Sequence, residues 1–109
     1  MASASVAGAD AAGADLAGCP WINRNIVVTG SGCSQDACKA NWNNQAKADC
    51  APQCAANTCQ NPPAPCITYG QTKSIGFRFT TADDQTCGGG KRYFCKATLI
   101  DCKCKCQGH

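Results

Sequence analysis

Twelve cysteines in a chain of 109 residues limit what this protein can fold into more than any other feature. Their number is even, and cysteines at this density form the framework of small extracellular folds. A domain of this length buries little apolar surface against the conformational entropy that folding costs. We therefore expect six disulfides, each of which stabilises a fold by about 2–4 kcal/mol. The cysteines concerned are Cys19, Cys33, Cys38, Cys50, Cys54, Cys59, Cys66, Cys87, Cys95, Cys102, Cys104 and Cys106.

Metal-bound thiolates are the alternative use of so many cysteines. Structural zinc sites favour cysteine pairs separated by two residues, and the sequence has no such pair. Metallothionein-like chemistry would also leave little room for a core, whereas Trp42, Phe77 and Phe94 indicate a packed domain. We expect no metal and no cofactor. Twelve cysteines allow roughly ten thousand pairings, so their connectivity stays open at this point.

The first half of the chain predicts a short strand followed by a helix. Residues 26–29 are a β-branched run that ends at the glycines of residues 30–32, which predict a turn. Ser34 is a predicted N-cap for a helix over residues 35–50, and Pro52 is expected to end or restart it. Four residues recur at intervals of four and would form one buried stripe on this helix: Cys38, Trp42, Ala46 and Cys50.

The second half predicts strands beyond the proline-rich connector at residues 61–65. Residues 66–69 form a brief strand, and residues 73–81 form the clearest one, because alternation would place Ile75, Phe77 and Phe79 on one face. A turn with two aspartates and three glycines would lead into a partner strand over residues 92–100. The predicted fold class is α+β: one main helix packed on a small, about three-stranded antiparallel sheet, rich in disulfides.

The segment Cys102-Lys103-Cys104-Lys105-Cys106 is the most specific local motif. On a strand its three sulfurs share one face and its two lysines share the other. The obvious partners of these cysteines are Cys50 and Cys54, at the end of the predicted helix. Leu99 has an odd number and Cys102 an even one, so an unbroken strand would place them on opposite faces. A bulge or turn near Asp101 would be needed to place both on the same face.

A helical Cys-x3-Cys tied to a strand Cys-x-Cys resembles the cysteine-stabilised αβ motif of defensins and scorpion toxins. Pro52 departs from that motif, because the interval between Cys50 and Cys54 should be regular helix. In size, cysteine density and order of elements, the whole chain resembles the small secreted cysteine-rich proteins of fungi, some of which are mushroom defence lectins. That resemblance implies a secreted, extracellular protein and carries over no binding residue.

Two parts of the chain differ in composition. Residues 1–18 are rich in alanine and glycine and predict a flexible tail of a mature chain whose signal was removed. Residues 19–109 form the single disulfide-stapled domain. The net charge of +3 suits an anionic glycan or a membrane surface, but lacks the clustered positive stripe of a nucleic-acid binder.

The residues favour binding over catalysis. The only histidine is His109, the last residue, so a nucleophile would have no base beside it. We expect a non-enzymatic glycan-binding protein, because aromatic rings contact the apolar faces of sugars and polar side chains bind their hydroxyls. The candidate ligand-binding residues are Tyr69, Arg78, Arg92 and Tyr93.

Two other functions stay open. One is a cationic toxin, effector or antimicrobial protein acting on a membrane or a protein receptor. Its charge would come from Lys91, Arg92, Lys96, Lys103 and Lys105. The other is a structural or assembly subunit, since an exposed sheet edge would allow a homodimer.

Overall fold

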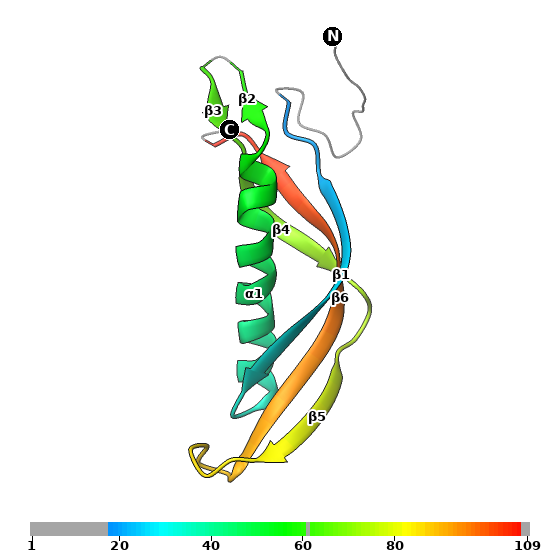
Figure 1. The fold of residues 1–109 in the computed structure, drawn as a ribbon, viewed down its shortest axis with the longest axis vertical. Coiled ribbons are helices and arrows are strands. Elements are labelled where there is room, and N and C mark those ends of the chain that lie inside the picture. Colours follow the sequence, from blue (N-terminus) through cyan, green and yellow to red (C-terminus); the bar gives the residue numbers. More distant parts are fainter. Residues whose placement is uncertain (1–17, 61, 108–109) are drawn as a thin grey trace.

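One helix lies along one face of an antiparallel sheet in the computed structural model, which describes residues 18–60 and 62–107 (Figure 1). The described residues form an elongated molecule of 56 × 23 × 17 Å. The predicted tail, apart from Gly18, and His109 lie outside the described residues. The elements in chain order are β1 (Ile22–Gly32), α1 (Gln35–Ala55), β2 (Thr58–Cys59), β3 (Ala64–Pro65), β4 (Ile67–Lys73), β5 (Arg78–Asp83) and β6 (Lys91–Lys105).

The long strand β6 is the centre of the main sheet. It pairs with β1 along one side, and with β4 and then β5 along the other. Four strands form the sheet, and at most three of them lie side by side at one level of β6. β2 and β3 make a separate two-stranded ribbon at the same end of the molecule as the C-terminal end of β6 (Figure 1). The predicted α+β fold class is confirmed.

The helix begins where the sequence predicts. The Ala37 N–H donates to the Ser34 side-chain oxygen at 3.0 Å, which satisfies one of the free amides of the first turn. The predicted stripe of Cys38, Trp42, Ala46 and Cys50 is buried. The prediction for Pro52 is wrong, because α1 continues through it to Ala55. Disulfides on both sides of the proline hold this last part of the helix against β6 and override its local preference.

All twelve cysteines are paired. Three disulfides join α1 to β6, and they include the predicted partners: Cys38–Cys95, Cys50–Cys102 and Cys54–Cys104. The other three close the two ends of the molecule: Cys19–Cys66, Cys59–Cys106 and Cys33–Cys87. Eleven of the twelve cysteines are buried, so disulfides replace much of an ordinary apolar core.

A bulge in β6 keeps its cysteines facing the helix on both sides of the bulge. The register shifts between Asn23 and Ile26 on β1 and between Thr72 and Lys73 on β4, so that Ile100 of β6 is skipped by both partners. The inward set is odd-numbered before this point and even-numbered after it. The predicted bulge near Asp101 is confirmed. The face of the sheet opposite α1, here called the outer face, therefore carries Thr98 before the bulge and Lys103 after it.

Two predicted strands differ from the structure. Residues 73–81 are not one strand, since the chain leaves β4 at Lys73 and enters β5 only at Arg78. Gly76, with φ +75, turns the chain between them, and Ile75 is fully exposed instead of facing inward. Residues 30–32 are the end of β1 and not a turn. A Cβ at Gly30 would lie 2.6 Å from the Cys38 carbonyl oxygen, so this glycine allows β1 to lie close against α1.

Candidate functional site

The structure does not bring the four predicted ligand-binding residues together. Arg78 pairs with Lys96 of β6, whereas Tyr69 lies between residues that pair with Cys104 and Lys103. These levels are about 23 Å apart along β6, at roughly 3.3 Å per residue. Tyr93 pairs with Gly32 and is part of the inward set, half-buried against the core below α1.

Arg92 forms an ion pair with an aspartate in the turn between β5 and β6. Its Nε lies 2.6 Å from Oδ2 of Asp84. The Thr86 side-chain hydroxyl and backbone N–H also donate to the Asp84 carboxylate. The guanidinium therefore has a structural partner, and of the four predicted residues only Tyr69 and Arg78 are exposed side chains on the outer face.

These contacts predict an unusually acidic carboxyl at Asp84. The Thr86 hydroxyl, then the Arg92 guanidinium and the Thr86 amide, lower the pKa of Asp84 from 3.8 to about 2. Because the folded-state pKa is depressed, the stabilisation is complete above pH ~4 and is lost as the pH falls through about 2. We expect Arg92→Gln to raise the pKa of Asp84, measured by carbon-detected NMR titration of its carboxyl. An unchanged pKa in this variant would contradict the role of Arg92.

A pair of exposed aromatic rings lies on the outer face near the C-terminal end of β6. Trp21 is 37% exposed and Tyr69 is 48% exposed, and the indole Nε1–H of Trp21 donates to the Tyr69 hydroxyl at 3.1 Å. The ammonium of Lys103 lies 5.3 Å from the Trp21 ring centroid, and that of Lys105 lies 5.4 Å from the Tyr69 ring centroid. We call these four residues the aromatic platform.

A disulfide brings the two rings together. Cys19 lies two residues before Trp21, Cys66 lies three residues before Tyr69, and the two cysteines are bonded to each other. The first residues of β1 and β4 are thereby tied across the end of β6. The platform is thus built on strands that covalent bonds hold in place.

A row of polar side chains crosses the sheet at Asp101, two residues along β6 from Lys103 of the platform. Asp101 pairs with Asn23 on one side and Thr72 on the other. Its carboxylate accepts from the Asn23 amide at 3.2 Å and from the Thr72 hydroxyl at 3.4 Å, and the Asn25 amide donates to Asn23 at 3.2 Å. Because these groups are only partly buried, their remaining donors and acceptors face the solvent beside the rings.

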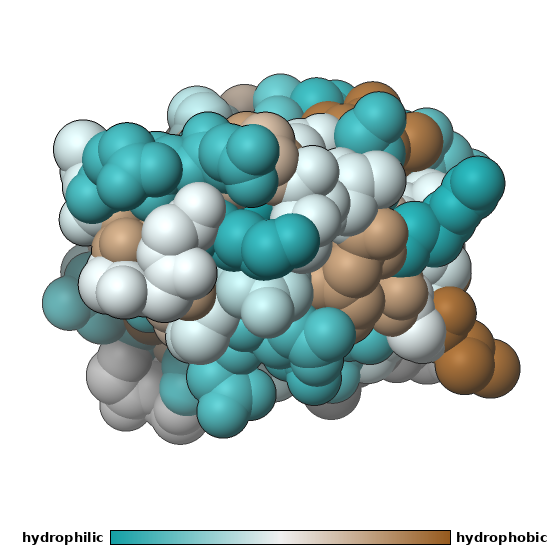
Figure 2. Space-filling view, turned by 90° about the horizontal axis from the view of Figure 1, so that it is seen from below, coloured by the Kyte–Doolittle hydropathy of each residue, from teal (hydrophilic) through white to brown (hydrophobic). Residues whose placement is uncertain are grey.

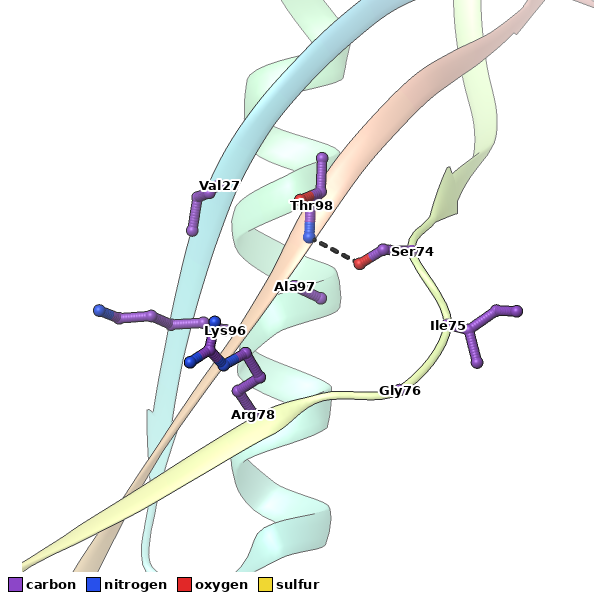
Figure 3. A pocket seen from close by; sticks show the side chains of 8 residues that line it. All are labelled: Val27, Ser74, Ile75, Gly76, Arg78, Lys96, Ala97 and Thr98. Carbon is purple, nitrogen blue, oxygen red and sulfur yellow. Dashed lines mark hydrogen bonds between the residues drawn. The ribbon is translucent and has the colours of Figure 1, made fainter.

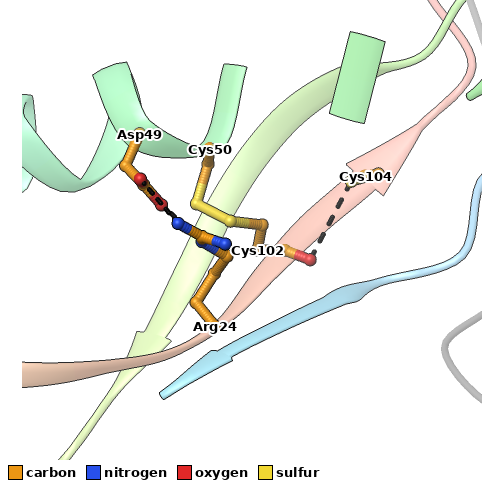
Figure 4. Close-up of polar contacts among 5 residues, drawn as sticks. All are labelled: Arg24, Asp49, Cys50, Cys102 and Cys104. Atoms are coloured by element: carbon orange, nitrogen blue, oxygen red, sulfur yellow. Dashed lines mark hydrogen bonds and ion pairs between the residues drawn. A yellow bond between two sulfur atoms is a disulfide. The ribbon is translucent and has the colours of Figure 1, made fainter. Parts of the chain in front are cut away.

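An ion pair anchors β1 to the helix behind this site (Figure 4). The Arg24 Nε and Nη2 donate to the two carboxylate oxygens of Asp49 at 2.8 and 3.0 Å. The hydrogen bonds with Asp49 raise the pKa of Arg24 above its ordinary value. The adjacent disulfide, Cys50–Cys102, fixes the same level of α1 to β6.

Two clusters of the described residues have the spacing of a metal site, Cys19 with Cys59 and Cys66, and Asp49 with Cys50 and Cys102. Metals bind thiolates, and every cysteine in both clusters is in a disulfide. Neither cluster therefore offers a thiolate, and Asp49 is occupied by Arg24.

Sequence reasoning missed Trp21, because nothing in the short interval after Cys19 predicts on which face of a strand it lies. The signal that identifies it is the Cys19–Cys66 pairing, which becomes visible only with the fold. Among the residues that the structure describes, α1 is not long and apolar enough to cross a membrane. Comparisons of this chain with protein-family models, with curated proteins and with solved structures find no match.

Proposed function

We propose that this protein is a secreted carbohydrate-binding protein that holds an acidic glycan on the aromatic platform. The observation that carries the proposal is the exposed, hydrogen-bonded pair of Trp21 and Tyr69 on the outer face of the sheet, the face away from α1. Six disulfides are typical of extracellular proteins.

The chemistry of the platform fits a sugar ring. The apolar face of a pyranose packs on an aromatic ring, and the ring hydroxyls then need donors and acceptors at its edge. The row formed by Asn23, Thr72 and Asp101 supplies amide, hydroxyl and carboxylate groups beside the rings. Lys103 and Lys105 would move from their cation–π positions to pair with a carboxylate or sulfate on the sugar.

Rigid placement favours binding of a weakly interacting ligand. Little entropy is lost when the side chains that meet the ligand are already ordered. Trp21 and Tyr69 lie at the beginning of strands held by the Cys19–Cys66 disulfide, and they restrain each other through one hydrogen bond. The site is therefore formed before the glycan arrives.

The test is a glycan-array screen of the oxidised protein, followed by titrations of the best acidic glycan with Trp21→Ala and Tyr69→Ala. Each variant should weaken binding about 5- to 30-fold, since an aromatic contact contributes on the order of 1–2 kcal/mol. Tyr93→Phe is the control, because its ring lies on the helix side of the sheet. Full affinity in both platform variants would refute the proposal.

The two lysines have a separate test. Lys103→Gln combined with Lys105→Gln should reduce binding of the acidic glycan by about tenfold and leave binding of its neutral analogue unchanged. The remaining affinity should be insensitive to salt, because ring stacking does not depend on charge. Equal losses for both glycans would show that the lysines act by supporting the rings.

A further inference from the structure

We propose a second binding site on the outer face, a membrane-contact site that receives the anionic headgroups of phospholipids and inserts Ile75 among them. This site shares no residue with the aromatic platform, so it goes beyond the glycan-binding function. It lies where the chain crosses from β4 to β5, beside the middle of β6 (Figures 1 and 3).

A hollow of about 350 Å³ marks this position. Its residues come from β1, from the segment between β4 and β5, from β5 and from β6 (Figure 3). Arg78 and Lys96 project from neighbouring strands on one side of the hollow, and Ile75 points away from it into the solvent (Figure 3). The lining residues are Val27, Ser74, Ile75, Gly76, Arg78, Lys96, Ala97 and Thr98.

Among the residues that the structure describes, no acidic side chain forms an ion pair with the two cations of the hollow. Arg78 and Lys96 are directly opposite in the register, so their side chains share the outer face. Like charges in this arrangement repel each other and destabilise a sheet. Within residues 18–60 and 62–107, ion pairs join Arg24 to Asp49 and Arg92 to Asp84, and neither involves this pair. An anion between the two side chains would relieve the repulsion.

Ile75 is a fully exposed apolar side chain on an anchored segment. The preceding residue, Ser74, donates its N–H to the Thr98 carbonyl at 2.9 Å and accepts the Thr98 N–H on its hydroxyl at 3.0 Å. Gly76 then turns the chain with φ +75. The segment is therefore tied to β6 on one side of Ile75, which holds the side chain out from the sheet.

A lipid surface matches both features at once. An apolar side chain beside cations is the pattern of proteins that rest in the headgroup region of a bilayer. Val27, 66% exposed on the neighbouring strand, extends the apolar contact. In the end-on view, hydrophilic and intermediate residues cover most of the visible surface, and hydrophobic residues reach it in separate places (Figure 2).

The test is co-sedimentation with phosphatidylcholine vesicles, with and without phosphatidylserine. The wild-type protein should bind the phosphatidylserine vesicles, and the binding should weaken as salt is added. Arg78→Gln with Lys96→Gln should lower the partition coefficient about 25-fold, at about fivefold for each cation. Ile75→Ser should lower it about 10-fold or more. The charge-matched control, Lys47→Gln with Lys91→Gln, should show a much smaller decrease, because both residues lie outside the hollow.

The outcomes separate this site from the glycan site. Trp21→Ala should bind vesicles as the wild type does, and Ile75→Ser should keep its glycan affinity. Wild-type protein that fails to bind the phosphatidylserine vesicles would overturn the membrane proposal. Equal losses in the hollow variant and its charge-matched control would also overturn it. Binding of a soluble sulfated polysaccharide through Arg78 and Lys96, without vesicle binding, would assign the two cations to a different ligand.

Discussion

Removing the Cys50–Cys102 disulfide, by Cys50→Ala with Cys102→Ala, should lower the free energy of unfolding by about 2–4 kcal/mol. The two cysteines are 52 residues apart, and an isolated cross-link of this length would remove about 4 kcal/mol of entropy from the unfolded chain at 25 °C. The neighbouring Cys54–Cys104 disulfide stays closed in the variant, so the expected loss is smaller than that value. The bond also joins α1 to the central strand, and both cysteines are fully buried. Denaturant unfolding of the oxidised variant, followed by circular dichroism, measures the loss.

A second disulfide provides a matched control. Cys33–Cys87 has nearly the same separation, 54 residues, but Cys33 is exposed and the bond ties a loop near the end of β1 to the turn before β6. Chain entropy alone predicts equal losses for the two double variants. A larger loss for Cys50–Cys102 would be the contribution of its buried packing. A loss below about 1 kcal/mol for Cys50–Cys102 would contradict the role of the disulfides as the main framework.

Trp42→Ala should cost about 3–5 kcal/mol, the range for truncating a large buried aromatic. Trp42 is fully buried between α1 and the sheet, its indole Nε1–H donates to the Val28 carbonyl at 2.8 Å, and its ring lies 5.5 Å from the Phe77 ring, edge to face. Few other large side chains fill this small core, so the surrounding structure has little with which to close the cavity.

Trp42→Phe separates the two contributions of this side chain. It keeps a ring against Phe77 but removes the indole hydrogen bond to the Val28 carbonyl, which should cost about 0.5–1.5 kcal/mol. Thermal unfolding of the two variants beside the wild type measures both values. A Trp42→Ala protein as stable as Trp42→Phe would show that the ring contributes little packing, and would contradict the position of Trp42 as the centre of the core.

Local patterns predicted the elements whose signals agree with their tertiary contacts. The Ser34 cap, the stripe around Trp42 and the spacing of Cys102 and Cys104 each depend on neighbours in the sequence. The odd and even numbering of Leu99 and Cys102 also indicated that a bulge near Asp101 was needed if both were to share a face, and the structure has this bulge.

Long-range contacts decided the parts that sequence reasoning missed. Pro52 stays helical because disulfides flank it. Alternation through Ile75 and Phe77 resembles a strand, yet Gly76 adopts a positive φ and the chain shifts from one segment of β6 to another. No local sequence pattern predicts this move from one part of β6 to another, because it depends on where β4 stops pairing with β6.

The candidate site was predictable only in part. Tyr69 was identified as a ring on a strand, but its partner, Trp21, becomes visible only when Cys19 is known to bond Cys66. By contrast, Tyr93 and Arg92 have residue types that are common in binding sites, but Tyr93 packs against the core and Arg92 pairs with Asp84. Residue type therefore pointed to candidate binding residues, whereas the disulfide pairing determines where the two exposed rings meet.

The most direct test of the glycan-binding account is an NMR titration of the two indole N–H signals with the best acidic glycan. The Nε1–H of Trp21 bonds the exposed Tyr69 hydroxyl, whereas that of Trp42 bonds a buried carbonyl and serves as an internal control. We expect the Trp21 signal to shift on binding and the Trp42 signal to stay in place. A bound glycan that leaves the Trp21 signal unchanged would contradict the account.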